Sequence, residues 1–115
     1  MNFDSESKDG LVVCSVSGEI DMYAAPGFHE KYRAITAKDP NCAIVIDLAG
    51  TTYMDSSGIG VLFQIFSDAK LRHKAFCICN VSGMVEKLFQ LSRMNSILPI
   101  EKNVANAIAR VRGSK

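Results

Sequence analysis

Residues 43–48 read Ala43-Ile44-Val45-Ile46-Asp47-Leu48, and residues 53–60 read Tyr53-Met54-Asp55-Ser56-Ser57-Gly58-Ile59-Gly60. The first segment is a short, nearly continuous apolar run, which is typical of a central β-strand covered on at least one face. We expect a turn at Gly50 after this strand. Apolar residues then recur at helical spacing from Ile59 to Ala69. The stretch therefore predicts a strand, a turn and a helix, with polar residues 55–57 where the helix begins.

The rest of the chain continues this alternation of strands and helices. The turn signal Asp9-Gly10 separates Phe3 from the β-branched run 11–16, so we expect a β-hairpin there. Pro26 suits the first turn of a helix, because its missing N–H is not needed at that position. That helix should bury one apolar stripe, formed by Ala25, Phe28, Tyr32 and Ile35. The remaining expected elements are a strand at 75–81, a helix capped by Ser82, an edge strand at 97–100 and an amphipathic helix at 104–111.

The resulting element order is β-β-α-β-α-β-α-β-α. Strands that alternate with helices form largely parallel sheets with crossovers of one hand, whereas the initial hairpin adds an antiparallel pair. The sequence thus predicts an α/β fold with a mixed, mostly parallel five-stranded sheet and about four helices. Residues 1–115 are expected to form a single domain. The segments 5–10 and 112–115 are expected to be loosely held.

Composition excludes several classes of partner. Hydrophobic residues make up 48% of the chain, and the net charge is +1 with dispersed basic residues. Because no basic face is clustered to neutralise phosphates, we expect no nucleic-acid partner. The N-terminus lacks the pattern of a secretory signal, and the longest apolar stretch, at 58–66, is too short to span a membrane. A cytoplasmic protein without a membrane partner is therefore expected.

The sequence also offers no pattern typical of a metal or cofactor site. There are four cysteines, at positions 14, 42, 77 and 79. Because no CxxC motif is present, we interpret them as small buried hydrophobes in a reducing cytosol, with Cys77 and Cys79 on one face of a strand. No Walker lysine or G-x-G-x-x-G motif is present for a nucleotide. Asp47 and Asp55 are better explained by structural roles than by magnesium binding.

Three interpretations of the segment 55–60 remain open from its residues alone. In the first, Asp55, Ser56 or Ser57 caps the helix, and the two glycines allow close packing against the sheet. In the second, Ser56 is a hydrolase nucleophile. This second interpretation is disfavoured, because Met54 stands where the nucleophile elbow needs glycine and no pattern links His29 or His73 to the serine.

The third interpretation is a phosphoacceptor serine. A phosphate adds about −1.5 to −2 charges at neutral pH, and the N–H groups of a helix N-terminus tolerate such a charge. The modified chain would therefore stay folded while the charge of its surface changed.

Three segments together resemble a known family. They are Gly18-Glu19-Ile20-Asp21, Ala24-Ala25-Pro26 and Tyr53-Met54-Asp55-Ser56-Ser57-Gly58-Ile59-Gly60-Val61, and the later Val85-Glu86-Lys87-Leu88-Phe89 also fits. The chain is similar, over nearly its whole length, to the STAS-domain anti-sigma-factor antagonists. It departs from the family pattern where His73-Lys74 and Arg93 or Met94 replace the usual glycines, which should alter the geometry of two loops.

The resemblance implies a cycle of partner switching in bacterial transcription. Members of this family bind an anti-sigma factor that is also a serine kinase, and this binding frees the sigma factor. The kinase phosphorylates the serine after the aspartate, here Ser56, with Ser57 as second choice, and the phosphorylated form is released. A metal-dependent serine phosphatase then restores it. The chain would be a ligand and a substrate, with no cofactor and no catalysis of its own.

The resemblance also implies a contact surface beside Ser56. The loop Asp21–Ala24 is expected to share it, with Met22 and Tyr23 as its apolar contacts, although both side chains could instead pack under the first helix. The full set of expected partner-binding residues is Asp21, Met22, Tyr23, Ala24, Met54, Asp55, Ser57, Gly58, Ile59 and Gly60. The alternative function is a STAS adaptor that is never phosphorylated, such as a subunit of a transport ATPase or a scaffold.

Overall fold

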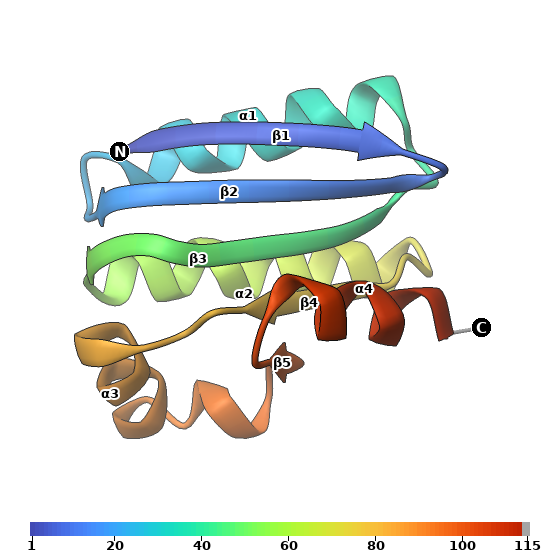
Figure 1. Cartoon of the computed structure of the whole chain (residues 1–115). Helices are drawn as coiled ribbons and strands as arrows, with labels where there is room; N and C mark the ends of the chain where they lie inside the picture. Colours follow the sequence, from blue (N-terminus) through green and yellow to red (C-terminus); the bar gives the residue numbers. More distant parts are fainter. Residues whose placement is uncertain (114–115) are drawn as a thin grey trace.

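A mixed five-stranded sheet forms the centre of the molecule. The structure is a computed structural model that describes residues 1–113. The strands are β1 (Asn2–Lys8), β2 (Leu11–Ile20), β3 (Ala43–Met54), β4 (Phe76–Cys79) and β5 (Ile100–Glu101), and they lie side by side in that order. β1 pairs antiparallel with β2, and the other neighbours pair in parallel. The predicted α/β fold with its mixed, mostly parallel sheet is confirmed (Figure 1).

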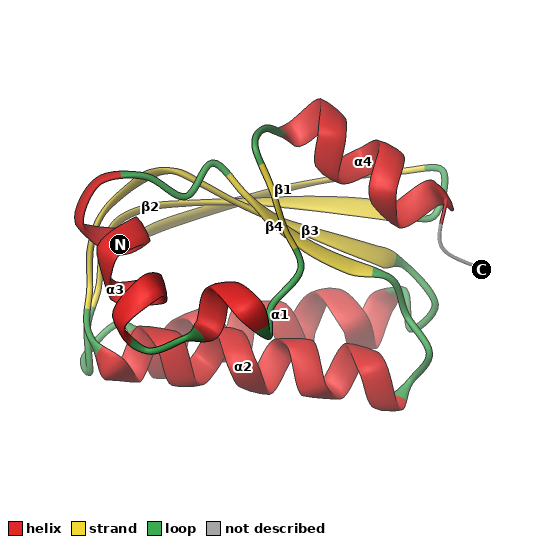
Figure 2. Cartoon of the chain, turned by 90° about the horizontal axis from the view of Figure 1, so that it is seen from below, coloured by secondary structure: helices red, strands yellow, loops and turns green. Residues whose placement is uncertain are grey.

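Helices cover the sheet on both faces. α1 (Ala25–Lys38), α2 (Ser56–Leu71) and α3 (Gly83–Leu91) lie on one face, and α4 (Val104–Gly113) lies on the other (Figure 2). Side chains of β3 alternate between two cores, because Ile44 and Ile46 pack with α1 and α2 whereas Val45 packs against Ala107 of α4. A strand buried on both faces needs apolar residues at every position, which explains the continuous run at 44–46.

Strands β2 and β3 are both longer than the apolar runs 11–16 and 43–48 from which the sequence predicted them. β3 continues through Gly50 to Met54, so the turn expected at Gly50 is wrong. Gly50 lies opposite Ser17 of β2, and the pairing shifts register on either side of residues 17 and 18. A Cβ at Gly50 would lie 2.7 Å from the Ser17 Cβ, so glycine here permits close contact between strands rather than a reversal.

The N-terminal segment belongs to the sheet. The hairpin is confirmed, with Phe3 opposite Val16 and Lys8 opposite Leu11. The expectation that residues 5–10 are loosely held is therefore wrong, because all of β1 is paired. The turn Asp9-Gly10 has positive φ at both residues, 53° and 76°, as a two-residue hairpin turn requires. At the other end, Arg112 and Gly113 belong to α4, and residues 114–115 lie outside the described chain.

The segment after α3 differs from its prediction. A 3₁₀ turn, Met94–Ser96, follows α3, and β5 comprises only Ile100 and Glu101 instead of 97–100. The Leu98 N–H donates to the Met94 carbonyl at 2.8 Å, which curls the chain and buries Leu98. Strand β4 is also shorter than the predicted 75–81, and Ser82 stands at the N-cap of α3 without a side-chain hydrogen bond.

The two predicted departures from glycine fall on strained backbone. His73 and Arg93 have φ of 58° and 62°, in the left-handed region that favours glycine. Both residues end a helix, where a left-handed residue reverses the chain direction. The two residues therefore adopt the backbone conformation that glycine would favour, and whether the loops differ from those of the family stays a prediction. Among the described residues, no helix is long and apolar enough to cross a membrane.

Replacing Arg93 with glycine should stabilise the protein. The left-handed conformation costs an L-residue about 1–2 kcal/mol, part of which is offset by the greater chain entropy of glycine when unfolded. We expect Arg93→Gly to raise the free energy of unfolding by about 0.5–1 kcal/mol in urea titrations. Arg93→Ala removes the same side chain but keeps Cβ, so it should give no gain. Equal stability of the two variants would contradict the assignment of strain.

Candidate functional site

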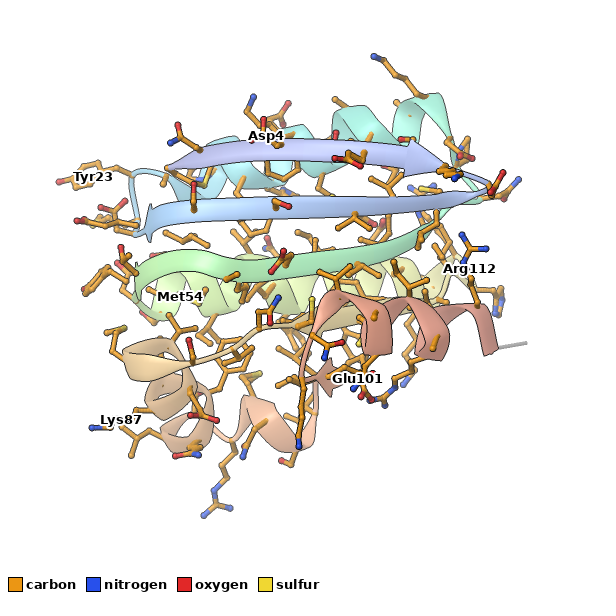
Figure 3. The ribbon with its side chains drawn as sticks, viewed as in Figure 1. Asp4, Tyr23, Met54, Lys87, Glu101 and Arg112 are labelled. Atoms are coloured by element: carbon orange, nitrogen blue, oxygen red, sulfur yellow. The ribbon has the colours of Figure 1, made fainter. Side chains whose placement is uncertain are left out.

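The predicted site residues meet at the carboxyl ends of β2 and β3. These two strands run in parallel and end together, because Ile20 pairs with Met54. The loop 21–24 follows β2, and Asp55 follows β3 and precedes α2. Segments that are more than thirty residues apart in sequence therefore lie side by side, with Tyr23 and Met54 at the same end of the sheet (Figure 3).

Asp55 is the N-cap of α2. Its Oδ1 accepts hydrogen bonds from the Ser57 N–H at 2.9 Å and from the Gly58 N–H at 3.3 Å. These bonds satisfy two of the backbone donors that a helix start leaves without partners. The cap predicted among Asp55, Ser56 and Ser57 is thus Asp55, and both serine hydroxyls are left out of it.

A second aspartate organises the loop beside the cap. Asp21 Oδ1 accepts from the N–H groups of Tyr23 and Ala24, both at 3.0 Å. The Asp21 carbonyl oxygen accepts from the Ala25 N–H at 2.9 Å, which leads the chain into α1. The other oxygen of Asp55, Oδ2, accepts from the Met22 N–H at 3.2 Å. The loop and the start of α2 are therefore joined by a hydrogen bond.

The candidate residues differ sharply in exposure. Met22 and Tyr23 are 61% and 85% exposed, so the alternative that they pack under the first helix is wrong. Ser56 and Gly60 are exposed, whereas Asp21, Ala24, Asp55 and Ser57 are half-buried. Met54, Gly58 and Ile59 are buried, and Met54 is only 1% exposed. The Met54 side chain thus supports the surface from below and has no area to offer a partner.

Gly58 lets α2 approach the end of β2. A Cβ at this position would lie 2.4 Å from Met54 Cγ and 2.7 Å from the Ile20 carbonyl oxygen. At Gly60 a Cβ would meet nothing within 4 Å. The predicted role of the glycines in close helix–sheet packing is therefore confirmed for Gly58 and wrong for Gly60, which faces solvent.

Two exposed aromatic residues, one at the end of β3 and one halfway along α2, were not predicted as site residues. Tyr53 is 40% exposed and is the penultimate residue of β3, and Phe63 is 41% exposed on α2. Phe63 lies seven residues after Ser56, which places both on one side of the helix. The signal for Phe63 was available, because the apolar stripe 59, 62, 65, 66 and 69 does not include it.

Neither histidine is placed to activate Ser56. His73 follows the C-terminal end of α2, and the 16 residues of that helix separate it from Ser56 by roughly 24 Å. His29 stacks on the Tyr32 ring at 6.4 Å, and the Tyr32 hydroxyl donates to Asp68 at 2.6 Å, far along α2 from Ser56. The geometry therefore does not support the hydrolase interpretation.

The other candidate groups have structural roles. Asp47 accepts from the Ala49 N–H at 3.0 Å and from Asn80 Nδ2 at 2.9 Å. The four cysteines are buried and free, as predicted, and burial raises the pKa of Cys14 and of Cys79 to about 12. Within residues 1–113, no group of three or more His, Cys, Asp or Glu side chains could hold a metal ion.

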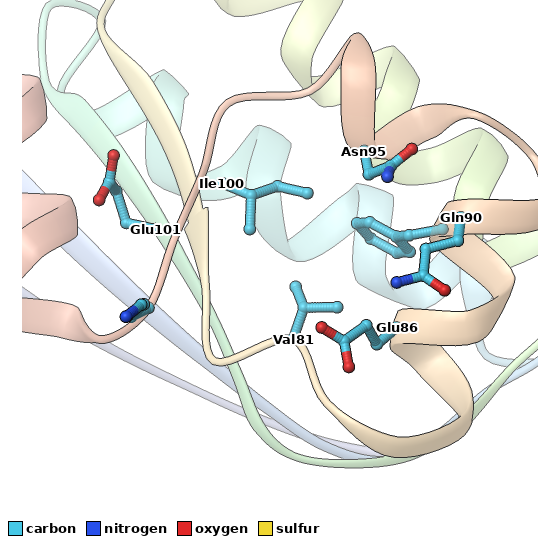
Figure 4. Close-up of a pocket in the computed structure, with 8 residues that line it drawn as sticks. Val81, Glu86, Gln90, Asn95, Ile100 and Glu101 are labelled. Atoms are coloured by element: carbon cyan, nitrogen blue, oxygen red, sulfur yellow. The ribbon is translucent and has the colours of Figure 1, made fainter.

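A separate hollow lies between α3 and β5 (Figure 4). It includes none of the predicted site residues. Its walls combine apolar and amide or carboxyl side chains, among them Val81, Glu86, Phe89, Gln90, Asn95 and Ile100. The hollow is therefore not part of the candidate site, whose residues all lie elsewhere.

The close approach at Gly58 gives a paired test of the geometry. Gly58→Ala should destabilise the protein by about 1–3 kcal/mol, because the added methyl group collides with Met54 and with the Ile20 backbone. Gly60→Ala should stabilise it by up to about 1 kcal/mol through helix propensity, since the site is open. Thermal and urea unfolding of both variants measure the difference. A Gly58→Ala variant as stable as Gly60→Ala would contradict the packing described.

Comparisons with known proteins agree with this fold. The family model described as the STAS domain matches residues 2–107. The anti-sigma-B factor antagonist of Listeria monocytogenes is 34% identical over 89 residues, covering 77% of this chain and 76% of that protein. The crystal structure of an anti-sigma factor antagonist from Mycobacterium paratuberculosis is similar with a TM-score of 0.86 and 28% identity, covering 96% of this chain and 93% of that one.

A further solved structure shares the fold at lower identity. The Bacillus cell fate determinant SpoIIAA in its phosphorylated form has a TM-score of 0.73 and 23% identity, covering 96% of this chain and 99% of that one. The matched residues span nearly the whole chain, and the predicted resemblance to this family is confirmed. The chain therefore belongs to the STAS domain family, and relatives that it resembles are named anti-sigma factor antagonists.

Proposed function

We propose that this chain is an anti-sigma-factor antagonist switched by phosphorylation at Ser56. The unphosphorylated form binds an anti-sigma factor with serine kinase activity and so frees the sigma factor. Phosphorylation ends this binding, and a metal-dependent serine phosphatase reverses it. The observation that carries the proposal is the exposed Ser56 at the start of α2, beside the exposed side chains of Met22 and Tyr23.

The docking surface consists of the exposed and half-buried residues at this end of the molecule. We define it by Asp21, Met22, Tyr23, Ala24, Asp55, Ser56, Ser57 and Gly60. Met54, Gly58 and Ile59 are buried and form its base. Apolar side chains as exposed as Met22 and Tyr23 are typical of contact surfaces, in which aromatic residues and methionine are enriched.

The position of Ser56 supports it over Ser57 as the phosphoacceptor. Ser56 is exposed, whereas Ser57 is half-buried. A kinase must bring the serine hydroxyl into its own active site, which favours the accessible residue. A protein of this fold can carry a phosphate, because SpoIIAA has been solved in a phosphorylated form.

Electrostatics explain how a phosphate could end binding. The docking surface already carries Asp21 and Asp55 and has no lysine or arginine among its residues. A phosphate would add about −1.5 to −2 charges to it. Placing like charges together at an interface costs several kcal/mol, and about 3 kcal/mol weakens binding roughly a hundredfold. Because Ser56 lies outside the core, the fold should be unaffected.

Two substitutions at Ser56 test this switch. Ser56→Ala should bind the anti-sigma factor constitutively and accept no phosphate at this position. Ser56→Asp should fold normally and bind the anti-sigma factor far more weakly. Binding is measured by capture from native cells followed by titration of the purified partner, and phosphorylation by intact mass and phosphopeptide mapping from cells lysed with phosphatase inhibitors.

The matched control is Ser7→Asp, which adds the same charge to an exposed serine next to the β1–β2 turn, at the opposite end of the sheet. It should bind like the wild-type chain. The proposal is sunk if Ser56→Asp binds as well as Ser56→Ala or if it unfolds. A chain that binds its partner but is never phosphorylated in cells would indicate the adaptor function instead.

A further inference from the structure

The two oxygens of the Asp55 carboxylate bind different segments of the chain. Oδ1 accepts from the Ser57 and Gly58 amides at the start of α2. Oδ2 accepts from the Met22 amide at 3.2 Å, across 33 residues of sequence. An N-cap needs only one side-chain oxygen, so the second bond is additional to the cap.

We propose that Asp55 is a positioning residue for the docking surface, because its Oδ2 holds the loop 21–24 against the start of α2. This inference rests on the proposed function. Met22 and Tyr23 are thereby fixed relative to Ser56, and the two segments present one continuous surface. Asp55 acts through the Met22 backbone and needs no contact of its own with the partner.

One other hydrogen bond joins this region to the start of α2: the Asp55 N–H donates to the Ile20 carbonyl oxygen at 3.4 Å, which holds the last residue of β2 and not residues 22–24. The hydrogen bonds that Asp21 makes with Tyr23 and Ala24 lie within the loop and shape it without tying it to the helix. The side chains of Met22 and Tyr23 are mostly exposed, so packing contributes little. Among the described residues, the bond from Met22 to Asp55 is the hydrogen bond that joins loop residues 22–24 to residues 55–60.

The chain offers a matched pair of variants, Asp55→Asn and Asp21→Asn. Asparagine is among the best N-cap residues, so Asp55→Asn keeps an oxygen for Ser57 and Gly58. Its Nδ2, in place of Oδ2, is a donor and cannot accept from the Met22 N–H. In Asp21→Asn the Oδ1 that accepts from Tyr23 and Ala24 is kept. Both variants remove one negative charge from the same surface.

Backbone amide NMR of the isolated full-length chain tests the bond directly. In Asp55→Asn, the Met22 amide proton should move upfield and its hydrogen exchange should accelerate by roughly tenfold, because it loses a charge-assisted acceptor. The Ser57 and Gly58 amides should keep their protection. In Asp21→Asn, the Met22 amide should behave as in the wild-type chain. Unchanged Met22 exchange in Asp55→Asn, with the Ser57 and Gly58 amides still protected, would overturn the inference.

Measuring the affinity for the anti-sigma factor distinguishes a failure of this inference from a failure of the proposed function. Asp55→Asn in the Ser56→Ala background should bind the anti-sigma factor roughly tenfold more weakly than Ser56→Ala alone, with equal thermal stability. Equal affinity of the two variants overturns the positioning role. If the wild-type chain binds no anti-sigma factor, the proposed function fails, and the NMR result still decides whether Asp55 holds the loop.

A second variant, Asp55→Ser, tests the same bond in case asparagine at position 55 does not cap α2. Serine also caps helices well, and its single short side chain supplies one oxygen. Asp55→Ser should therefore keep α2 folded, with protected Gly58, while it releases Met22. If both Asp55 variants leave Met22 protected, another group holds the loop and Asp55 has no positioning role.

Discussion

The parallel pairing of β2 with β3 determines where every part of the candidate site lies. The two longest strands of the sheet end at the same level, because Ile20 pairs with Met54. Each strand is followed by a segment that contains candidate site residues. The loop 21–24 follows β2, and the start of α2 follows β3. A parallel pair brings such segments together even though the helix α1 separates them in sequence.

At the end of this strand pair, closely packed buried residues lie beneath exposed ones. Gly58 brings the first turn of α2 against Ile20 and Met54, leaving no room for a methyl group. Directly above this packed layer stand the exposed Ser56 and the exposed loop residues Met22 and Tyr23. The exposed residues therefore lie at the edge of the hydrophobic core, to which Ile20 and Met54 belong.

Periodicity in the sequence was sufficient to predict the order of elements and the mixed sheet. The buried run 44–46, the stripe of α1 and the turn Asp9-Gly10 are local signals, and each was interpreted correctly. The errors arose where tertiary contacts override local signals. Gly50 indicates a turn in isolation, but its pairing with Ser17 keeps it within β3. The curl after α3 depends on the left-handed backbone of Arg93, a conformation that arginine does not signal.

The same limit applied to the site. Met22, Tyr23 and Met54 are all large apolar residues, and nothing local distinguishes the exposed pair from the buried one. The difference follows from the glycine at 58, which brings α2 down over Met54, whereas the Met22 loop has no helix above it. Motif resemblance singled out residues that the structure places together at one end of the sheet, but which of them are exposed and which are buried depends on the packing of α2.

The cap on α2 has a consequence for where a phosphate on Ser56 would find partners. Helix N-termini usually neutralise bound phosphates through their first free amides. Here the Ser57 and Gly58 amides are already occupied by the Asp55 carboxylate, which is itself negative. A phosphate on Ser56 would therefore gain little shielding from its own chain. The negative charge of the phosphate would therefore stay largely uncompensated within the chain, and a protein that approaches this face would meet it.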